Sequence, residues 1–344
     1  MRQHARALLT VDEVRDVSHA FGLRRPIEAE PLGRGSRQSA KSRLRTPAGQ
    51  YFLKRRAVDA AARLGFVHSF QLHLAAAGVP VAQVLPTLDG RTVHVAGGGA
   101  YELFRWIDGG RWSMRVDESA EVGAAIGALL RASASFPAPA DAPRAGFHRQ
   151  GPLAGSEDQV VAAVLRADPG AGESALRECV GRLVAAASRA HERAADAGLS
   201  RTPVLCVHGD LHPGNVLFAD GRLRAILDFD GARVDHRACE VANALVHFGS
   251  HPIAGIAPEG WRPELDLARM TAVLAGTERA IGARLSDEER RALPWLMIES
   301  CTLESLVPVA RTGRFAHLQA ADFLPFIERK VAWIESSASS VQGL

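Results

Sequence analysis

One block between residues 204 and 230 constrains this chain more than any other feature of its sequence. An apolar run, Val204–Val207, leads into the segment H-G-D-L-H-P-G-N at 208–215. A second apolar run follows, and the turn Asp220-Gly221 separates it from a third run that ends in the segment I-L-D-F-D at 226–230. Short apolar runs bounded by Gly, Pro and Asp predict β-strands joined by tight turns. The block therefore predicts a hairpin with polar side chains at its ends.

Those polar side chains suit phosphate chemistry with a divalent metal ion. Hairpin geometry predicts that Asn215 and Asp228 come together although 12 residues separate them. An amide oxygen and a carboxylate are hard ligands for Mg²⁺, which binds through few protein groups together with phosphate oxygens. Asp210 is then a further carboxylate, able to orient a hydroxyl group and accept its proton.

The two parts of the chain on either side of residue 104 differ in character. The first part predicts a short helical lead-in over 1–24, strand-like runs around the turn at 46–49, a helix from about Ala57 to Ala77 and a strand at 101–104. The second part is mostly helical, with apolar residues at helical spacing over 119–132, 157–166, 173–196, 238–248, 264–283, 286–306 and 316–337. Residues 133–156 are rich in Ala, Pro and Gly and predict a surface loop. The chain is therefore expected to be of the α+β class.

The segment 208–215 resembles the catalytic loop of the aminoglycoside phosphotransferase, choline kinase and type II homoserine kinase group. It matches the pattern H-G-D-x-H-x-x-N of that group at every fixed position, and 226–230 is similar to the group's I-D-[FW]-[DE] element. The resemblance extends in order from about Ile27 to Gly249 and implies a two-lobed protein-kinase-like fold. Its N-lobe, 1–104, would be a small antiparallel sheet with one helix and a hinge at 101–104. Its C-lobe, 105–344, would be larger, mostly helical, and hold the catalytic loop 208–215 and the metal motif 228–230.

The resemblance also implies roles for single residues of the C-lobe. Asp210 corresponds to the catalytic base, and Asn215 and Asp228 correspond to the Mg²⁺ ligands. Asp230 would assist the metal or anchor the loop. His208 would make a structural hydrogen bond within it.

In the N-lobe the resemblance implies a nucleotide site. Lys54, at the end of an apolar strand, corresponds to the lysine that binds the α- and β-phosphates. It is one of only three lysines beside 38 arginines, which suggests that a lysine is needed there. The phosphate-covering loop would contain Gly33, Gly35 and Ser36, and the backbone of the hinge, with Glu102 and Phe104, would pair with adenine. The implied cofactors are ATP, with GTP left open, and Mg²⁺.

Two departures from the group's pattern raise questions of their own. The helix after Lys54 has no acidic residue at the place of the usual lysine partner, so His68, Gln71 or the phosphates alone are expected to hold the ammonium group. The group has an Asp at the start of the helix that supports the catalytic loop, and Glu240 is the candidate for it here. The simplest reading of Arg55-Arg56 is a solvated face, and that of the Glu102 side chain is freedom to vary.

Other functions stay open at this point. His208, Asp210 and His212 also have a spacing that a zinc-dependent hydrolase could use. A kinase-like protein that binds ATP and Mg²⁺ without turnover is the other alternative, supported by the missing helix glutamate. Glu299 and Glu304 on a late helix are expected to face solvent rather than to bind a cationic substrate.

Composition excludes several classes of protein. The chain of 344 residues has a formal net charge of +3, and residues 1–64 have an excess of eight positive charges that favours phosphate. No basic stripe with interleaved aromatic residues predicts nucleic-acid binding, and no apolar run is long enough to span a membrane. Four cysteines without a C-x-x-C pair predict a reducing, cytoplasmic location.

The expected partner is a small-molecule hydroxyl substrate: an antibiotic such as an aminoglycoside, a sugar, an amino alcohol or homoserine. The oligomeric state is left open.

Overall fold

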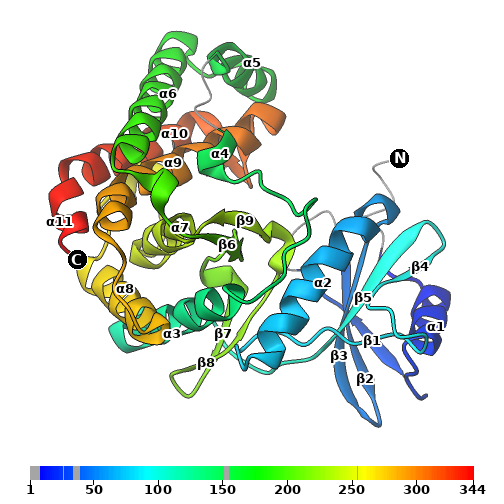
Figure 1. The fold of residues 1–344 in the computed structure, drawn as a ribbon. Helices are drawn as coiled ribbons and strands as arrows, with labels where there is room; N and C mark the ends of the chain where they lie inside the picture. The colour runs from blue at the N-terminus through cyan, green and yellow to red at the C-terminus, as the bar shows by residue number, and fades with distance from the viewer. Residues whose placement is uncertain (1–7, 26, 34–38, 151–154, 254) are drawn as a thin grey trace. The chain divides into compact units, whose positions relative to one another are not determined.

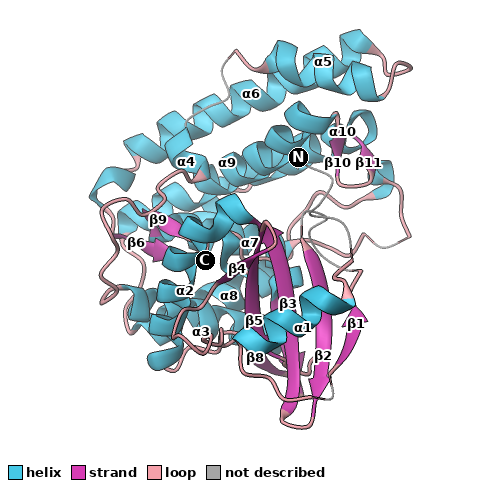
Figure 2. Cartoon of the chain, turned by 90° about the vertical axis from the view of Figure 1, so that its right-hand side faces the viewer, coloured by secondary structure: helices cyan, strands magenta, loops and turns pink. Residues whose placement is uncertain are grey.

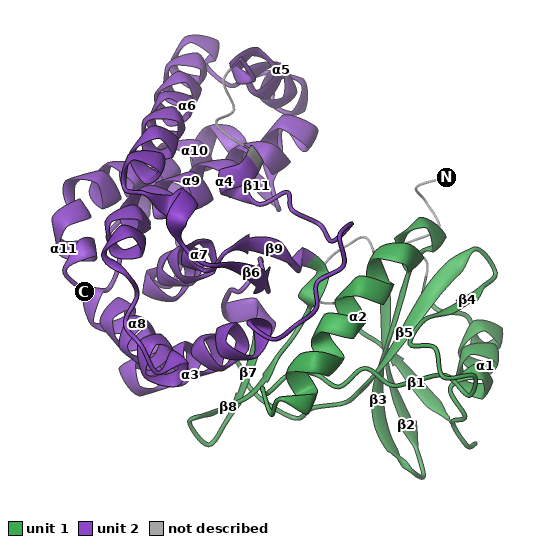
Figure 3. Ribbon diagram, in the orientation of Figure 1, with its two compact units in different colours: residues 1–111, 216–230 green, residues 112–215, 231–344 purple. Residues whose placement is uncertain are grey.

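The computed structural model describes residues 8–25, 27–33, 39–150, 155–253 and 255–344. The chain forms two compact units (Figure 3). Unit 1 comprises residues 1–111 and 216–230, and unit 2 comprises residues 112–215 and 231–344. The chain therefore passes from one unit to the other three times.

Unit 1 contains a five-stranded antiparallel sheet with the strand order β1-β2-β3-β5-β4 (Figure 2). Its strands are β1 (Glu28–Pro31), β2 (Ala40–Thr46), β3 (Gly49–Ala57), β4 (His94–Ala96) and β5 (Gly99–Arg105). The predicted turn at 46–49 joins β2 to β3, with Thr46 paired to Gly49. Gly49 has a φ of 136°, which a residue with a side chain rarely adopts. The predicted antiparallel sheet is confirmed.

Helices lie on both faces of this sheet (Figures 1 and 2). The expected helix is α2 (Ala61–Ala76), which follows the 3₁₀ turn η2 (Val58–Ala60). The lead-in is α1 (Val11–Ala20), which begins with a capping box formed by Thr10 and Glu13. Val14, Val17 and Phe21 of this lead-in form a core with Leu44, Tyr51, Leu53, Tyr101 and Leu103 of the sheet. The predicted lead-in therefore packs on the sheet as a second helix, where the sequence analysis expected only one helix on the sheet.

The hairpin of β7 (Val216–Ala219) and β8 (Arg222–Ile226) belongs to unit 1. Its turn, Asp220-Gly221, has φ angles of 54° and 71°, the left-handed pair that a two-residue hairpin favours. Bridges join Phe218 to Gly110 and Ile226 to Val81. Because backbone hydrogen bonds attach the hairpin to unit 1, the division differs from the expected one, which placed residues 228–230 in the second lobe and the boundary at 104.

Unit 2 is mostly helical, as predicted (Figure 1). A long helix, α9 (Asp287–Thr312), packs against α5 (Glu157–Ala167), α6 (Glu173–Asp196), α7 (Arg237–Gly249) and α10 (Ala320–Ser336). A second pair, α3 (Val116–Ser133) and α8 (Leu267–Ile281), packs so closely that a Cβ on Gly123 would lie 2.0 Å from the carbonyl oxygen of Val273. The remaining elements are short: α4 (Phe147–Gln150), α11 (Ala338–Gln342), β6 (Val204–Val207), β9 (Arg233–His236), β10 (Arg314–Phe315), β11 (Leu318–Gln319), and the 3₁₀ turns η3 (Leu199–Arg201), η4 (Pro213–Asn215), η5 (Phe229–Gly231) and η6 (Pro258–Gly260).

Two details of unit 2 differ from the sequence prediction. The stretch 133–156, predicted as a loop, contains the short helix α4. Helix α9 continues six residues beyond the predicted end at 306, because Gly313 with a φ of 69° supplies its left-handed C-cap. All four cysteines are free and buried. Among the described residues, no helix has the length and apolar character that crossing a membrane requires.

Candidate active site

The first part of the candidate site is an ion-pair cluster in unit 1 with a buried lysine and two half-buried aspartates. The Nζ atom of Lys54 lies 2.9 Å from Oδ1 of Asp228 and 3.3 Å from Oδ2 of Asp230. Only 4% of Lys54 is exposed. A buried ammonium group is stable only when anionic partners compensate its charge. The two carboxylates after β8 are those partners.

This arrangement answers the question of what holds Lys54, and the three expected answers were wrong. His68 lies with Nε2 2.8 Å from Oε2 of Glu102, and Gln71 donates from Nε2 to the carbonyl oxygen of Ala82 at 2.6 Å. Phosphates are not the sole partners of Lys54, since Asp228 compensates the charge of its ammonium group. The lysine partner comes from the hairpin of β7 and β8 instead of from α2.

The side chain of Glu102 is part of the same polar cluster. It is buried on β5, directly opposite Lys54 of β3, and it accepts hydrogen bonds from Arg56 and pairs with His68. Burial raises the pKa of Glu102, but the His68 hydrogen bond and the charges of Arg56 and Lys54 hold it below its ordinary value. The prediction that this side chain is free to vary was wrong, because removing it would leave a buried guanidinium group without one of its anions.

Arg56 links this cluster to the metal motif. Its guanidinium group donates to both carboxylate oxygens of Asp230 as well as to Glu102. Burial opposes ionisation of Asp230, but Lys54 and Arg56 outweigh it and lower its pKa. Arg55, on the opposite side of the strand, pairs with Glu13 of α1. The prediction of a solvated Arg55-Arg56 face was therefore wrong, and the alternation of β3, which places Lys54 and Arg56 on one face, was the signal that would have corrected it.

The remaining predicted residues of unit 1 lie as follows. Asp228 has a φ of 59°, a left-handed conformation that Asp tolerates better than most residues. Phe104 is half-buried and its ring meets that of His68 edge to face at 6.0 Å. Gly33 is exposed. Gly35 and Ser36 lie outside the described residues.

The second part of the candidate site is the loop 208–215 in unit 2. Strand β6, paired with β9, leads into this loop. Gly209 has a φ of 77°, and a Cβ at this position would lie 2.4 Å from the carbonyl oxygen of Gly231. Arg233 donates from Nη1 to the carbonyl oxygen of Gly209 at 2.8 Å. The loop therefore needs a glycine at its second position and is held there by an arginine of β9.

Hydrogen bonds within the loop orient its functional groups. The Nδ2 group of Asn215 donates to the carbonyl oxygen of Asp210 at 2.9 Å, so the oxygen is the atom that this amide offers to a ligand. His208 is fully buried, and its Nδ1 accepts from the backbone N–H of Asp210 at 3.2 Å. Asp210 itself is exposed. The loop thus presents a carboxylate on a fixed backbone.

Glu240 lies against this loop, in the supporting place for which it was a candidate. Its Oε2 atom accepts from the backbone N–H of Gly209 at 2.8 Å. The carboxyl group is buried on α7, and among the described residues its Oε1 has no hydrogen-bond partner. Burial raises the pKa of Glu240 from 4.5 to about 7. The group is therefore protonated over part of the neutral range.

The Glu240→Gln variant is expected to remove a pH dependence of stability. Because the pKa of Glu240 is higher in the folded than in the unfolded chain, its contribution is fully present below about pH 4.5 and is lost as the pH rises through about 7. The loss amounts to about 3 kcal/mol for a shift of this size. Glutamine keeps the acceptor for Gly209 and does not ionise. Urea unfolding followed by tryptophan fluorescence should show a shallower decline of stability between about pH 5 and pH 8 for the variant; equal declines would contradict the assigned pKa.

Two carboxylates of α9 were expected to face solvent, and that prediction was wrong. Glu299 is buried, with two histidines, His148 and His191, at its carboxylate. Glu304 is half-buried and lies with Oε2 3.0 Å from Nε2 of His247, whose ring lies 5.8 Å from that of His212 in the loop 208–215. The neighbours that cover both come from other helices, so periodicity within α9 does not reveal them.

The spacing of His208, Asp210 and His212 was one possible zinc site. In the part of the chain that the structure describes, the one group of three such side chains with all ligand atoms within 4.8 Å of one another is His148, His191 and Glu299. The geometry therefore gives the hydrolase alternative no three-ligand site at the loop.

Comparisons with known proteins agree with the resemblance of the 208–215 segment. The model of the phosphotransferase enzyme family matches residues 28–295. A homoserine kinase of Gluconacetobacter diazotrophicus is 27% identical over 338 residues, which cover 94% of this chain and 92% of that protein. The family resemblance predicted from the sequence is confirmed.

Solved structures show the same fold at low sequence identity. A microcompartment-associated aminopropanol kinase superposes with a TM-score of 0.66 at 17% identity, covering 97% of this chain and 99% of that chain. An amicoumacin kinase solved with AMP-PNP and Ca²⁺ gives 0.64 at 14%, covering 96% of each chain. A spectinomycin phosphotransferase solved with ADP and spectinomycin gives 0.61 at 11%, covering 97% and 98%.

Sequence pattern, fold and family model lead to one assignment. The structural neighbours confirm the kinase-like fold of the α+β class. The family model spans well over half of the chain and includes the loop 208–215 and the motif 228–230. The chain belongs to the phosphotransferase enzyme family and is a small-molecule kinase.

Proposed function

We propose that this protein transfers the γ-phosphoryl group of ATP, with Mg²⁺, to the hydroxyl group of a small molecule that also has an amino group. The observation that carries the proposal is the buried pair of Lys54 with Asp228 and Asp230. A cation and two carboxylates held together in this way provide both a phosphate-binding group and hard oxygen ligands for a metal ion.

The nucleotide side of the proposal rests on unit 1. Lys54 is assigned to the α- and β-phosphates, and the backbone of Glu102 to Phe104 to the adenine edge. Arg56 and His68 would keep the Glu102 side chain in place, so that β5 presents its backbone in one conformation. Gly33, Gly35 and Ser36 are assigned to the loop over the phosphates. The assay described below compares ATP with GTP as the phosphoryl donor at this site.

Asp228 and Asn215 are assigned as metal ligands, with Asp230 in support. The donor set fits Mg²⁺, because a carboxylate and an amide oxygen are hard ligands and the Asn215 nitrogen is already engaged within its loop. When bound, the metal ion neutralises charge on the phosphates. Asp230, held by Arg56, keeps a negative charge beside Lys54 and stabilises the position of that side chain.

Asp210 is assigned as the base. Its carboxylate is exposed on a loop whose backbone is fixed through Gly209 by Arg233 and Glu240. The acceptor hydroxyl would donate a hydrogen bond to this carboxylate and transfer its proton there as its oxygen attacks the γ-phosphorus, the bond to the bridging oxygen breaks and ADP leaves. Positioning and charge neutralisation account for most of the catalysis of phosphoryl transfer.

The proposal that the acceptor has an amino group rests on a carboxylate of unit 2. Glu304 is a half-buried carboxylate that accepts a hydrogen bond from Asn243 and lies 3.0 Å from His247, and the charge of Arg233 also acts on it. Burial raises its pKa, but the hydrogen bond and charge of His247 outweigh this and lower it, so the group is anionic. The ring contact of His247 with His212 connects Glu304 to the catalytic loop. A carboxylate in this place favours an ammonium group on the substrate, as in homoserine or an amino alcohol, over a sugar.

A coupled assay of ADP release across an acceptor panel tests this function. The panel contains homoserine, 1-amino-2-propanol, choline, an aminoglycoside, a hexose and a nucleoside, each with ATP or GTP and with or without Mg²⁺. We expect acceptor-dependent ADP release with Mg²⁺ and ATP, and only for compounds with a cationic aliphatic nitrogen, which the hexose and the nucleoside lack. Tight ATP binding in calorimetry without turnover of any acceptor would instead favour a silent ATP-binding protein.

A further inference from the structure

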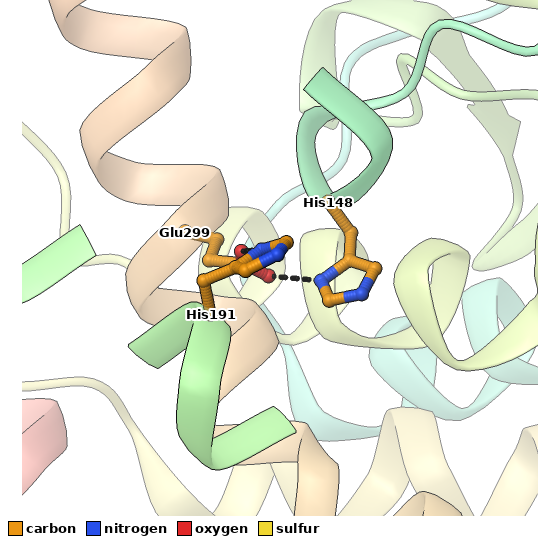
Figure 4. Close-up of side chains that lie close together, drawn as sticks. All are labelled: His148, His191 and Glu299. Atoms are coloured by element: carbon orange, nitrogen blue, oxygen red, sulfur yellow. Dashed lines mark hydrogen bonds and ion pairs between the residues drawn. The ribbon is translucent and has the colours of Figure 1, made fainter. Parts of the chain in front are cut away.

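A cluster of two histidines and one glutamate lies in unit 2 (Figure 4). The Nδ1 atom of His148 lies 2.8 Å from Oε2 of Glu299, and Nδ1 of His191 lies 2.8 Å from Oε1 of the same carboxylate. The two imidazole rings stack with their centroids 4.6 Å apart. One potential ligand atom of each residue thus lies within 4.8 Å of the others.

These three side chains come from three separate elements. His148 is on α4, His191 on α6 and Glu299 on α9, and Figure 4 shows the two histidines pointing to the carboxylate from different helices. Such convergence of residues that are distant in sequence is what a bound ion requires. The helix α4 is only four residues long, and Phe147 beside His148 is buried as well.

The carboxylate of Glu299 is buried, and both ion-pair partners that the structure gives it are histidines. Glu299 is 1% exposed, and neither partner is a Lys or Arg. A buried carboxylate needs a compensating positive charge. A divalent cation supplies it fully.

We propose that His148, His191 and Glu299 form a zinc site. Two imidazole nitrogens and one carboxylate oxygen are a donor set that Zn²⁺ binds in proteins, with a fourth position left for water. Each imidazole would bind the ion through Nδ1, and any proton on that nitrogen would move to Nε2 or leave to solvent. Donor atoms around a tetrahedral zinc ion are about 3.3 Å apart, given bonds of about 2.0–2.1 Å, so binding would require the two stacked rings to turn until both Nδ1 atoms point to one ion. Imidazole ligands make Mg²⁺ a poor occupant, because that ion prefers oxygen.

The expected effect of the ion is to fasten α4 to the helix pair α6 and α9. The neighbouring His236 is not part of the set, since its Nδ1 is bonded to Thr202 at 2.9 Å. His148 and His191 are partly exposed, so an ion from solvent has access to them. This inference does not depend on phosphoryl transfer, since none of the three residues belongs to the proposed catalytic groups.

Zinc binding to the full chain tests the proposal directly. The purified protein is stripped with a chelator, given ZnCl₂ in the presence of excess MgCl₂, dialysed and analysed for metal by mass spectrometry. We expect about one zinc ion per chain for the wild type. His148→Ala and His191→Ala should weaken zinc binding at least about 10-fold in competition with a chromophoric chelator. His317→Ala removes an exposed histidine of the same unit and should bind like the wild type.

Two further measurements keep the result interpretable. Circular dichroism of the metal-free variants checks that they fold, and Glu299→Gln, which keeps the size of the side chain, should also lose the zinc ion. Co²⁺ in place of zinc should give visible absorption in the wild type and His317→Ala only. The proposal is overturned when the wild type retains no zinc, or when folded His148→Ala retains as much zinc as the wild type.

Discussion

The Asp210→Asn variant is expected to lose most of its phosphotransferase activity while it still binds nucleotide. Asparagine has the same size and can accept a hydrogen bond from the substrate hydroxyl, but it cannot take up the proton. A positioned base contributes about 10²- to 10⁴-fold to a rate, so kcat should fall by that factor. Because Asp210 is exposed and its backbone makes the contacts that hold the loop, stability should change little.

The control for this variant is Asp141→Asn. Asp141 is an exposed aspartate of the same unit, in the stretch between α3 and α4. Both variants should melt within a few degrees of the wild type and bind ATP with the same Kd, and only Asp210→Asn should lose activity. If Asp210→Asn kept the kcat of the wild type, the assignment of Asp210 as the base would be contradicted, whereas the family assignment would stand.

The Asp228→Asn variant is expected to lose activity by a different route. It removes a negative charge from the proposed metal site and from the partner of Lys54. Loss of one electrostatic group of this kind costs about 10²- to 10³-fold in kcat, and the Mg²⁺ concentration for half-maximal activity should rise. The backbone is expected to tolerate the change, since Asn is as compatible as Asp with a φ of 59°.

Asp220→Asn is a matched control for that variant. Asp220 also has a left-handed backbone, with a φ of 54°, and it is exposed at the turn of the same hairpin. The two substitutions therefore make the same chemical change in the same kind of backbone. Activity assays over a range of Mg²⁺ concentrations should separate them, and an unchanged Mg²⁺ dependence in Asp228→Asn would contradict its role as a ligand.

Local patterns predicted much of this fold. The turn at 46–49, the helix α6 over 173–196 and the short strands on either side of Asp220 all follow from residues next to one another in the chain. The partner of Lys54 did not follow, because Asp228 is far away in sequence and belongs to a hairpin that was expected in the other lobe. The burial of Glu299 was missed for a similar reason, since α4 and α6 supply its neighbours.

The three lysines of this arginine-rich chain mark structurally special positions. All three lysines, Lys41, Lys54 and Lys330, are buried. Lys330 donates to Oγ of Ser250 at 2.8 Å, and burial lowers its pKa. A compact ammonium group on an unbranched chain fits such places, whereas the broad planar guanidinium group of arginine suits exposed or fork-shaped contacts. In this arginine-rich chain the remaining lysines mark positions where arginine is not an equivalent.

The interrupted course of the chain through unit 1 bears on its biosynthesis. Residues 1–111 leave the ribosome long before residues 216–230, yet the latter supply the carboxylates for Lys54. Until they are made, the nascent sheet has a lysine that must stay hydrated, so the amino-terminal part cannot reach its final structure early. The same reasoning applies to gene fusion and fragment expression: a fragment that stops near residue 111 lacks the two counterions of Lys54.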